Sequence, residues 1–161
     1  MLRAVCAVAC GAVLATGAAS AAVPPGTDMS DFATAALSSP KAGAKPVSLV
    51  VSLHTELQCG KLRAGLLALT FPSGFALPAT VGPSAVLVDG VKPSKVTLTG
   101  RTLSITMPVR TGVICMVIGP GTAKILVTKA AQLGNPSAAG VYTLGVRYRT
   151  ETLGAKLTIT A

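Results

Sequence analysis

The stretch from Gly134 to Arg149 constrains the fold of this 161-residue chain more than any other part. It begins with turn-forming residues: Gly134, Asn135, Pro136 and Gly140. From residue 142 onward it alternates between two faces, with Tyr142, Leu144, Val146 and Tyr148 on one and Thr143, Gly145, Arg147 and Arg149 on the other. Strict alternation over this length predicts a half-buried β-strand that follows a loop. The strand carries both tyrosines of a chain without tryptophan, so we expect it to supply much of the bulk of the core.

Short apolar alternations separated by Gly, Pro, Asn and Asp run through the rest of the chain from residue 47. The strands that they predict are 47–54, 65–71, 85–88, 95–99, 102–107, 113–118, 122–128, 142–149 and 152–160. Gly100-Arg101 has the length of a two-residue hairpin turn, and Asp89-Gly90 is a second turn signal. We therefore expect an all-β protein, an antiparallel β-sandwich of about eight to nine strands with two sheets packed face to face.

The first 45 residues predict export followed by a flexible leader. Arg3 precedes an apolar run of Ala, Val, Cys and Leu, and Ala19-Ser20-Ala21 has small residues at both positions that signal peptidase recognises. We interpret residues 1–21 as a signal peptide cut after Ala21, and we expect no transmembrane anchor in the mature chain. Residues 22–45 are rich in Ala, Pro, Ser and Gly and predict a flexible leader with at most a helical turn around 32–37. The predicted domain is then 46–161.

Removing the signal peptide leaves two cysteines, Cys59 and Cys115, in an exported chain. An even pair in an oxidising compartment predicts one disulfide, which disfavours the unfolded state by about 4 kcal/mol in the chain-entropy model. The alternatives are a metal site or a catalytic thiol. A tetrahedral zinc site needs four ligands, whereas the mature chain offers two cysteines and one histidine, so we expect no metal and no cofactor.

Several segments resemble an immunoglobulin-like β-sandwich module of bacterial secreted and cell-surface proteins. They are residues 71–78, 85–90, 101–108, 133–136 and 140–144. The resemblance covers about residues 65–150 in order and rests on turns and strand patterns. It implies a spacer or adhesive unit of a surface protein, whereas the cysteine pair and the single copy depart from the usual repeated module.

Catalysis has little material in this sequence. His54 is the only histidine, and it falls on the outward phase of its predicted strand. The five carboxylates are scattered, and the chain has no Gly-x-Ser-x-Gly nucleophile elbow. We therefore interpret His54 as a surface residue and expect that the protein is not an enzyme. A hydrolase is the weakest of the alternatives.

The mature chain has a formal net charge of about +8. Arg147 and Arg149 are two residues apart on one predicted strand face, so we name them as a possible anion-binding face for a cell-wall polymer or a lipid head group. The other cations are dispersed, and lysines commonly protect exposed strand edges. Only 3% of residues are aromatic, which argues against both single-stranded nucleic acid and stacking sugar sites.

Threonines, with one serine among them, recur two residues apart in three places: Thr97 and Thr99; Thr102, Ser104 and Thr106; and Thr158 and Thr160. Such arrays order water in some ice-binding solenoids, but the spacing here lacks a fixed period, and Thr is common on the solvent face of strands. The sequence as a whole predicts a non-enzymatic structural or binding module, secreted to the cell surface, the periplasm or the medium, whose partner is an envelope polymer or another surface protein. The alternative is a basic exported protein that binds an anionic envelope component.

Overall fold

Nine β-strands and two short 3-10 helices form the part of the chain that the computed structural model describes, residues 32–55, 66–106 and 121–161. The strands are β1 (Phe32–Leu37), β2 (Leu49–Thr55), β3 (Leu66–Thr70), β4 (Val86–Val88), β5 (Lys95–Thr99), β6 (Thr102–Thr106), β7 (Gly121–Val127), β8 (Gly140–Tyr148) and β9 (Glu151–Ile159). The helices are η1 (Pro83–Ala85) and η2 (Lys129–Ala131). The prediction of an all-β protein is confirmed.

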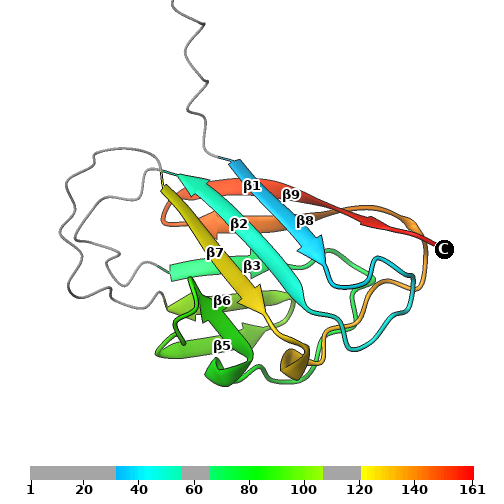
Figure 1. The fold of residues 1–161 in the computed structure, drawn as a ribbon, viewed down its shortest axis with the longest axis horizontal. Helices are drawn as coiled ribbons and strands as arrows, with labels where there is room; N and C mark the ends of the chain where they lie inside the picture. Colours follow the sequence, from blue (N-terminus) through cyan, green and yellow to red (C-terminus); the bar gives the residue numbers. More distant parts are fainter. Residues whose placement is uncertain (1–31, 56–65, 107–120) are drawn as a thin grey trace, which may run out of the picture.

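The strands form two antiparallel sheets that pack face to face (Figure 1). One sheet has four strands in the order β1-β2-β7-β4, and the other has five in the order β5-β6-β3-β8-β9. Every pair of neighbouring strands in both sheets is antiparallel. The chain is therefore a β-sandwich, as the spacing of the short strands predicts.

The core lies between the sheets and is made by the alternate residues of each strand. These inward residues are almost all aliphatic: Leu49, Val51, Leu53, Leu67, Leu69, Val86, Val88, Leu103, Ile105, Ala123, Ile125, Val127, Leu144, Val146, Ala155, Leu157 and Ile159. Phe71 and Phe75, which follow β3, fill the end of this core and contact each other at a centroid distance of 5.9 Å. Burial of these side chains is the main stabilising contribution to such a sandwich.

The tight turn between β5 and β6 is the one expected. Thr99 lies opposite Thr102, so Gly100 and Arg101 alone connect the two strands. Gly100 has a φ of +57°, a backbone conformation that glycine adopts without strain. The Asp89-Gly90 turn is also present, with φ values of +49° and +80°, and the backbone of Val88 pairs with that of Val91 across it.

The prediction that residues 22–45 form a flexible leader is wrong for their second half. Residues 32–37 form β1, not a helical turn, and pair with β2 along their whole length, from Phe32 opposite His54 to Leu37 opposite Leu49. Ala33, Ala35 and Leu37 pack against the core from this strand. Alanine has a low intrinsic preference for strands, so this segment becomes a strand because β2 offers it a complete row of backbone partners.

The loop before β8 holds the connection between β1 and β2 in place. Asn135 is only 4% exposed, and its Nδ2 donates hydrogen bonds to the carbonyl oxygens of Ser39 and Lys41, both at 2.8 Å. Its backbone N–H donates to the carbonyl oxygen of Ala44. Next to it, Gly134 exchanges two backbone hydrogen bonds with Ala76, and a Cβ at position 134 would lie 3.0 Å from the Ala76 Cβ. The turn residues of this loop are thus needed for close backbone approach.

Tyr142 and Tyr148 both face the interior side of β8, which confirms the predicted phase of this strand. Tyr148 is 4% exposed, whereas Tyr142 is partly buried. The Tyr142 ring lies edge-on to Phe75 at 6.0 Å, and its hydroxyl donates a hydrogen bond to the carbonyl oxygen of Ala138. The tyrosines therefore close one side of the core, but aliphatic residues supply most of its bulk.

We expect Tyr142→Phe to lower the free energy of unfolding by about 0.5 to 1 kcal/mol, because it removes the hydrogen bond of the hydroxyl to Ala138 and keeps the ring. Chemical denaturation followed by circular dichroism measures this change. Tyr142→Ala also removes the contact with Phe75 and is expected to cost about 3 kcal/mol. Equal losses in the two variants would contradict the assigned contact of the ring.

Several predictions concern residues outside the described ranges. These are the signal peptide at 1–21, the strand at 113–118 and the disulfide between Cys59 and Cys115. They stay predictions.

Candidate functional site

The outer face of the five-stranded sheet brings together hydroxyl side chains from all five strands. Residues directly opposite each other on neighbouring strands point to the same side of a sheet, so the register defines rows across it. One row reads Thr99, Thr102, Thr70, Gly145 and Gly154, and the next reads Thr97, Ser104, Ala68, Arg147 and Thr152. Both rows consist of hydroxyl and small side chains, apart from one arginine.

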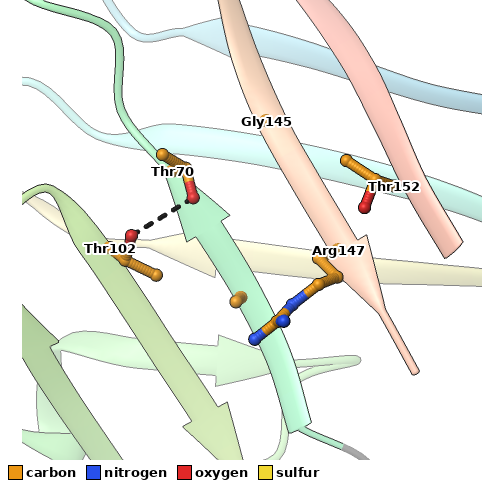
Figure 2. Close-up of a pocket in the computed structure, with 6 residues that line it drawn as sticks. Thr70, Thr102, Gly145, Arg147 and Thr152 are labelled. Carbon is orange, nitrogen blue, oxygen red and sulfur yellow. Dashed lines mark hydrogen bonds between the residues drawn. The ribbon is translucent and has the colours of Figure 1, made fainter. Parts of the chain in front are cut away.

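An open hollow of about 470 Å³ lies in the middle of this face. Its lining residues are Ala68, Thr70, Thr102, Gly145, Arg147 and Thr152. Figure 2 shows Arg147 extending from β8 toward β3, with Thr152 on the far side of β8. The hydroxyls of Thr70 and Thr102 lie 3.2 Å apart and share a hydrogen bond (Figure 2). The hollow therefore offers one cation and three hydroxyl groups to a ligand.

The hollow exists because the residues in its centre are small. Gly145 has no side chain between Thr70 and Gly154, and a Cβ there would lie 3.3 Å from the Thr70 Cβ. On the next strand, a Cβ at Gly154 would lie 3.1 Å from the Thr143 Cγ2. Larger residues at either position would push against these threonines, so the two glycines keep the centre of the face free of side chains.

Arg147 and Arg149 do not share a face, which corrects the prediction that they form a pair. The strand β8 ends at Tyr148, and Arg149 lies in the two-residue turn to β9 with a φ of +55°. Its guanidinium carbon lies 5.6 Å from the centre of the Tyr148 ring, on a residue of the inner side. The turn ends the alternation on which the prediction depended, so only Arg147 belongs to the outer face.

The charge on the outer face of this sheet has one sign. Its cations are Lys95, Arg147 and Lys156, each exposed. The described residues include two acidic side chains, Asp89 and Glu151. Asp89 follows β4 of the other sheet, and Glu151 pairs with Tyr148 on the inward phase of β9. No described position of this outer face therefore carries a carboxylate.

His54 lies on the outer face of the other sheet, as the predicted phase requires. Its Nδ1 is 3.1 Å from the Thr122 hydroxyl, and its ring stacks on Phe32 at 4.8 Å. A histidine that activates a hydroxyl also needs an acid to orient its ring, and neither Thr122 nor Phe32 is one. Within residues 32–55, 66–106 and 121–161, no three His, Cys, Asp or Glu side chains gather as metal ligands.

The outer face of the four-stranded sheet carries a row of aliphatic side chains that sequence reasoning missed. Ala36, Val50, Leu126 and Leu87 lie opposite one another across all four strands. None of them is in the buried core, and each is at least partly exposed. Phe32, at the end of the same sheet, is 51% exposed. Each strand contributes only one apolar residue to this row, so no periodicity within a strand predicts it. The row becomes visible only when the register between the strands is known.

No family model and no curated protein sequence matches the chain. Among solved structures, BslA, described as a bacterial hydrophobin, is similar with a TM-score of 0.52 and 17% identity over 81% of this chain and 98% of that chain. The N-terminal domain of the Streptococcus gordonii adhesin Sgo0707 gives a TM-score of 0.46 at 9% identity, covering 80% of this chain and 32% of that one. A putative membrane-anchored protein from Corynebacterium diphtheriae gives 0.41 at 13%, covering 83% and 35%.

The similarity to BslA shows a shared fold. Within the described parts of the chain, no helix has the length and apolar character to cross a bilayer.

Proposed function

We propose that the chain is a non-enzymatic structural or binding module of an exported bacterial protein, at the cell surface or in the medium, with a sandwich of the immunoglobulin-like kind. The observation that carries the proposal is the open outer face of the five-stranded sheet. It presents hydroxyls, small residues and three cations on rigid strands, a composition suited to contact and not to bond-making chemistry. The similarity in fold to BslA, which is described as a bacterial hydrophobin, agrees with such a role.

Sedimentation of the purified mature chain with cell envelopes from the producing cell tests this proposal. We expect saturable co-sedimentation of the folded protein and a clear loss after thermal unfolding. An unrelated β-sandwich of equal net charge serves as the control for general electrostatic adsorption. Absence of binding to envelopes would contradict a binding role at the cell surface, and a turnover that His54→Ala abolishes would contradict the non-enzymatic role.

Export and the disulfide belong to the same proposal. Thr55 lies opposite Gly121, and Leu66 lies opposite Thr106, so the described residues that flank Cys59 and Cys115 meet in pairs. This proximity of the flanking residues supports a bridge between the two cysteines. We expect the secreted protein to begin at Ala22 and to gain the mass of two hydrogen atoms on reduction, both measured by intact-mass spectrometry. Free thiols in the unreduced secreted protein would contradict the disulfide.

A second candidate function is adsorption at an apolar interface. It is favoured by the aliphatic row of Ala36, Val50, Leu126 and Leu87 on the four-stranded sheet and by the similarity to a protein described as a bacterial hydrophobin. Contact of a partly exposed aliphatic row with water is unfavourable, and transfer of the row to an air or oil surface removes that contact. The opposite sheet, rich in hydroxyls, would remain in water.

Surface tension of the purified protein at an air–water interface tests this candidate. We expect the wild type to lower the surface tension, and the double variant Leu87→Thr, Leu126→Thr to do so several times more slowly. Val141→Thr is the matched control, because Val141 is 66% exposed but lies on the outer face of the other sheet. Equal slowing by both sets of substitutions would contradict a role for the aliphatic row.

A further inference from the structure

We infer that the outer face of the five-stranded sheet binds an anionic polymer whose backbone carries hydroxyl groups and no stacking bases. We infer further that Arg147 binds one of the oxyanion groups of this polymer. The inference rests on the proposed function and names its binding face and its class of partner. The shared chemistry is an oxyanion on a polyol or polysaccharide chain. A phosphodiester and a carboxylate are the two sources of that group.

Charge complementarity is the first argument. Lys95, Arg147 and Lys156 occupy this face without a carboxylate among its described residues. The sign of the face is therefore uniform, whereas the described part of the other sheet has Asp89 next to Lys124, joined by a hydrogen bond from the Lys124 backbone N–H to the carboxylate at 2.8 Å. A face of one sign attracts an anion and does not compensate its own charge.

The spacing of the cations limits the class of polymer. Lys156 lies opposite Thr143, four residues along β8 from Arg147, which places the Cα atoms about 14 Å apart. Lys95 is three strands away and two residues along, which gives about 16 Å. Nucleic acid strands carry a phosphate about every 3.4 Å and bind denser arrays of cations. Cations this far apart do not pair with successive phosphates of a nucleic acid strand, so binding to this face depends on one oxyanion at Arg147 and on the hydroxyl contacts around it.

The hollow beside Arg147 is the second argument. A guanidinium binds a phosphate or a carboxylate through two parallel N–H donors. Thr70, Thr102 and Thr152 surround the same hollow with hydroxyls, which donate and accept hydrogen bonds with the hydroxyls of a polyol. Gly145 and Ala68 leave the space between them open.

The absence of rings on this face is the third argument. Of the aromatic residues that the structure describes, Phe71, Phe75, Tyr142 and Tyr148 belong to the core or its edge, and Phe32 lies on the other sheet. Single-stranded nucleic acid needs rings on which its bases stack. The face therefore selects a partner through hydroxyl and oxyanion contacts, and not through stacking.

Binding measurements with defined polymers test the inference. The probes are poly(glycerol phosphate), polygalacturonate, uncharged dextran and single-stranded DNA, each titrated into the mature protein at low ionic strength. We expect saturable binding of at least one of the two anionic polyols and none of dextran. The polymer that binds more tightly identifies phosphodiester or carboxylate as the natural group. Binding should weaken at least tenfold between low and physiological salt, because the contacts are exposed.

Two substitutions and a matched control locate the site. Arg147→Gln is expected to weaken binding at least tenfold, and Gly145→Val, which places a side chain in the hollow, should weaken it without changing the net charge. Lys124→Gln removes the same charge from the outer face of the other sheet and is expected to change affinity less than twofold. Thermal unfolding confirms that each variant is folded; if Gly145→Val is not, Thr152→Val replaces it.

Equal weakening by Arg147→Gln and Lys124→Gln would overturn the inference, because it would show a dependence on net charge alone. Tighter binding of DNA than of either polyol would also overturn it. If wild type and Arg147→Gln bind cell envelopes equally, the inference fails while the proposed function stands. If the wild type does not bind envelopes, the proposed binding role at the cell surface itself fails.

Discussion

Replacing Asn135 by Asp is expected to lower the free energy of unfolding by about 4 kcal/mol. The substitution keeps the shape of the side chain but turns its Nδ2 donor into an oxygen that faces the carbonyl oxygens of Ser39 and Lys41. The Oδ1 of Asn135 is buried and has no hydrogen-bond partner among the described residues, so the carboxylate would find no donor there either. Leaving two partly buried carbonyl groups without this donor and burying an uncompensated charge are each costly.

Urea unfolding of the purified protein measures this loss. Gln132→Glu is the matched control, since it makes the same amide-to-carboxylate change three residues earlier, at an exposed side chain whose Nε2 donates to the carbonyl oxygen of Lys129. We expect the control to cost less than about 1 kcal/mol. Similar losses for the two variants would show that the loop does not hold the segment between β1 and β2.

Replacing Arg101 by Met is expected to cost about 2 kcal/mol of folding free energy. Arg101 lies in the turn between β5 and β6, and its side chain donates three hydrogen bonds to the backbone that follows β3: Nε to the Phe71 oxygen at 3.0 Å, and Nη2 to the oxygens of Pro72 and Phe75. In the variant, the three carbonyl oxygens lose their charged hydrogen-bond donor and are only partly hydrated by water instead. The half-buried position of Arg101 limits the loss, because water reaches part of the site.

Arg149→Met provides the comparison for this prediction. Arg149 is also a turn arginine, but it is exposed and contacts the Tyr148 ring at 5.6 Å, so its loss is expected to cost about 0.5 kcal/mol. Thermal unfolding of both variants under one buffer condition measures the difference. A loss from Arg101→Met no greater than that from Arg149→Met would contradict the structural role of Arg101.

The strands with strong apolar alternation were predictable because their periodicity is local. Residues 142–148, 95–99 and 102–106 alternate within themselves and form β8, β5 and β6. β1 was not predictable in this way, because its sequence, Phe-Ala-Thr-Ala-Ala-Leu, has weak strand propensity and becomes ordered through β2 and the Asn135 loop. The hydrogen bond between Asn135 and Ser39 joins residues that are 96 positions apart, and such an interaction leaves no local pattern in the sequence.

Of the residues in the candidate site, only Arg147 was predictable as a binding residue from the sequence. Arg147 was expected on an exposed strand face and lies there, whereas Arg149 was misplaced because the strand ends one residue before it. The threonines were expected on solvent faces, but their assembly into rows with Gly145 and Ala68 depends on the order of strands in the sheet. Strand order is a property of the whole chain, and periodicity within one segment does not contain it.

The two outer faces of the sandwich are chemically unlike, and this gives a single molecule a built-in orientation. On the four-stranded sheet an aliphatic row lies beside a polar row of Thr34, Ser52 and Lys124, whereas the five-stranded face carries hydroxyls, three cations and one exposed apolar side chain, Val141. The faces point in opposite directions, because they are the two outsides of one pair of packed sheets. A molecule that settles on an oily or waxy surface by the first face therefore turns the second outward, so that a coat of such molecules would make that surface wettable and positively charged.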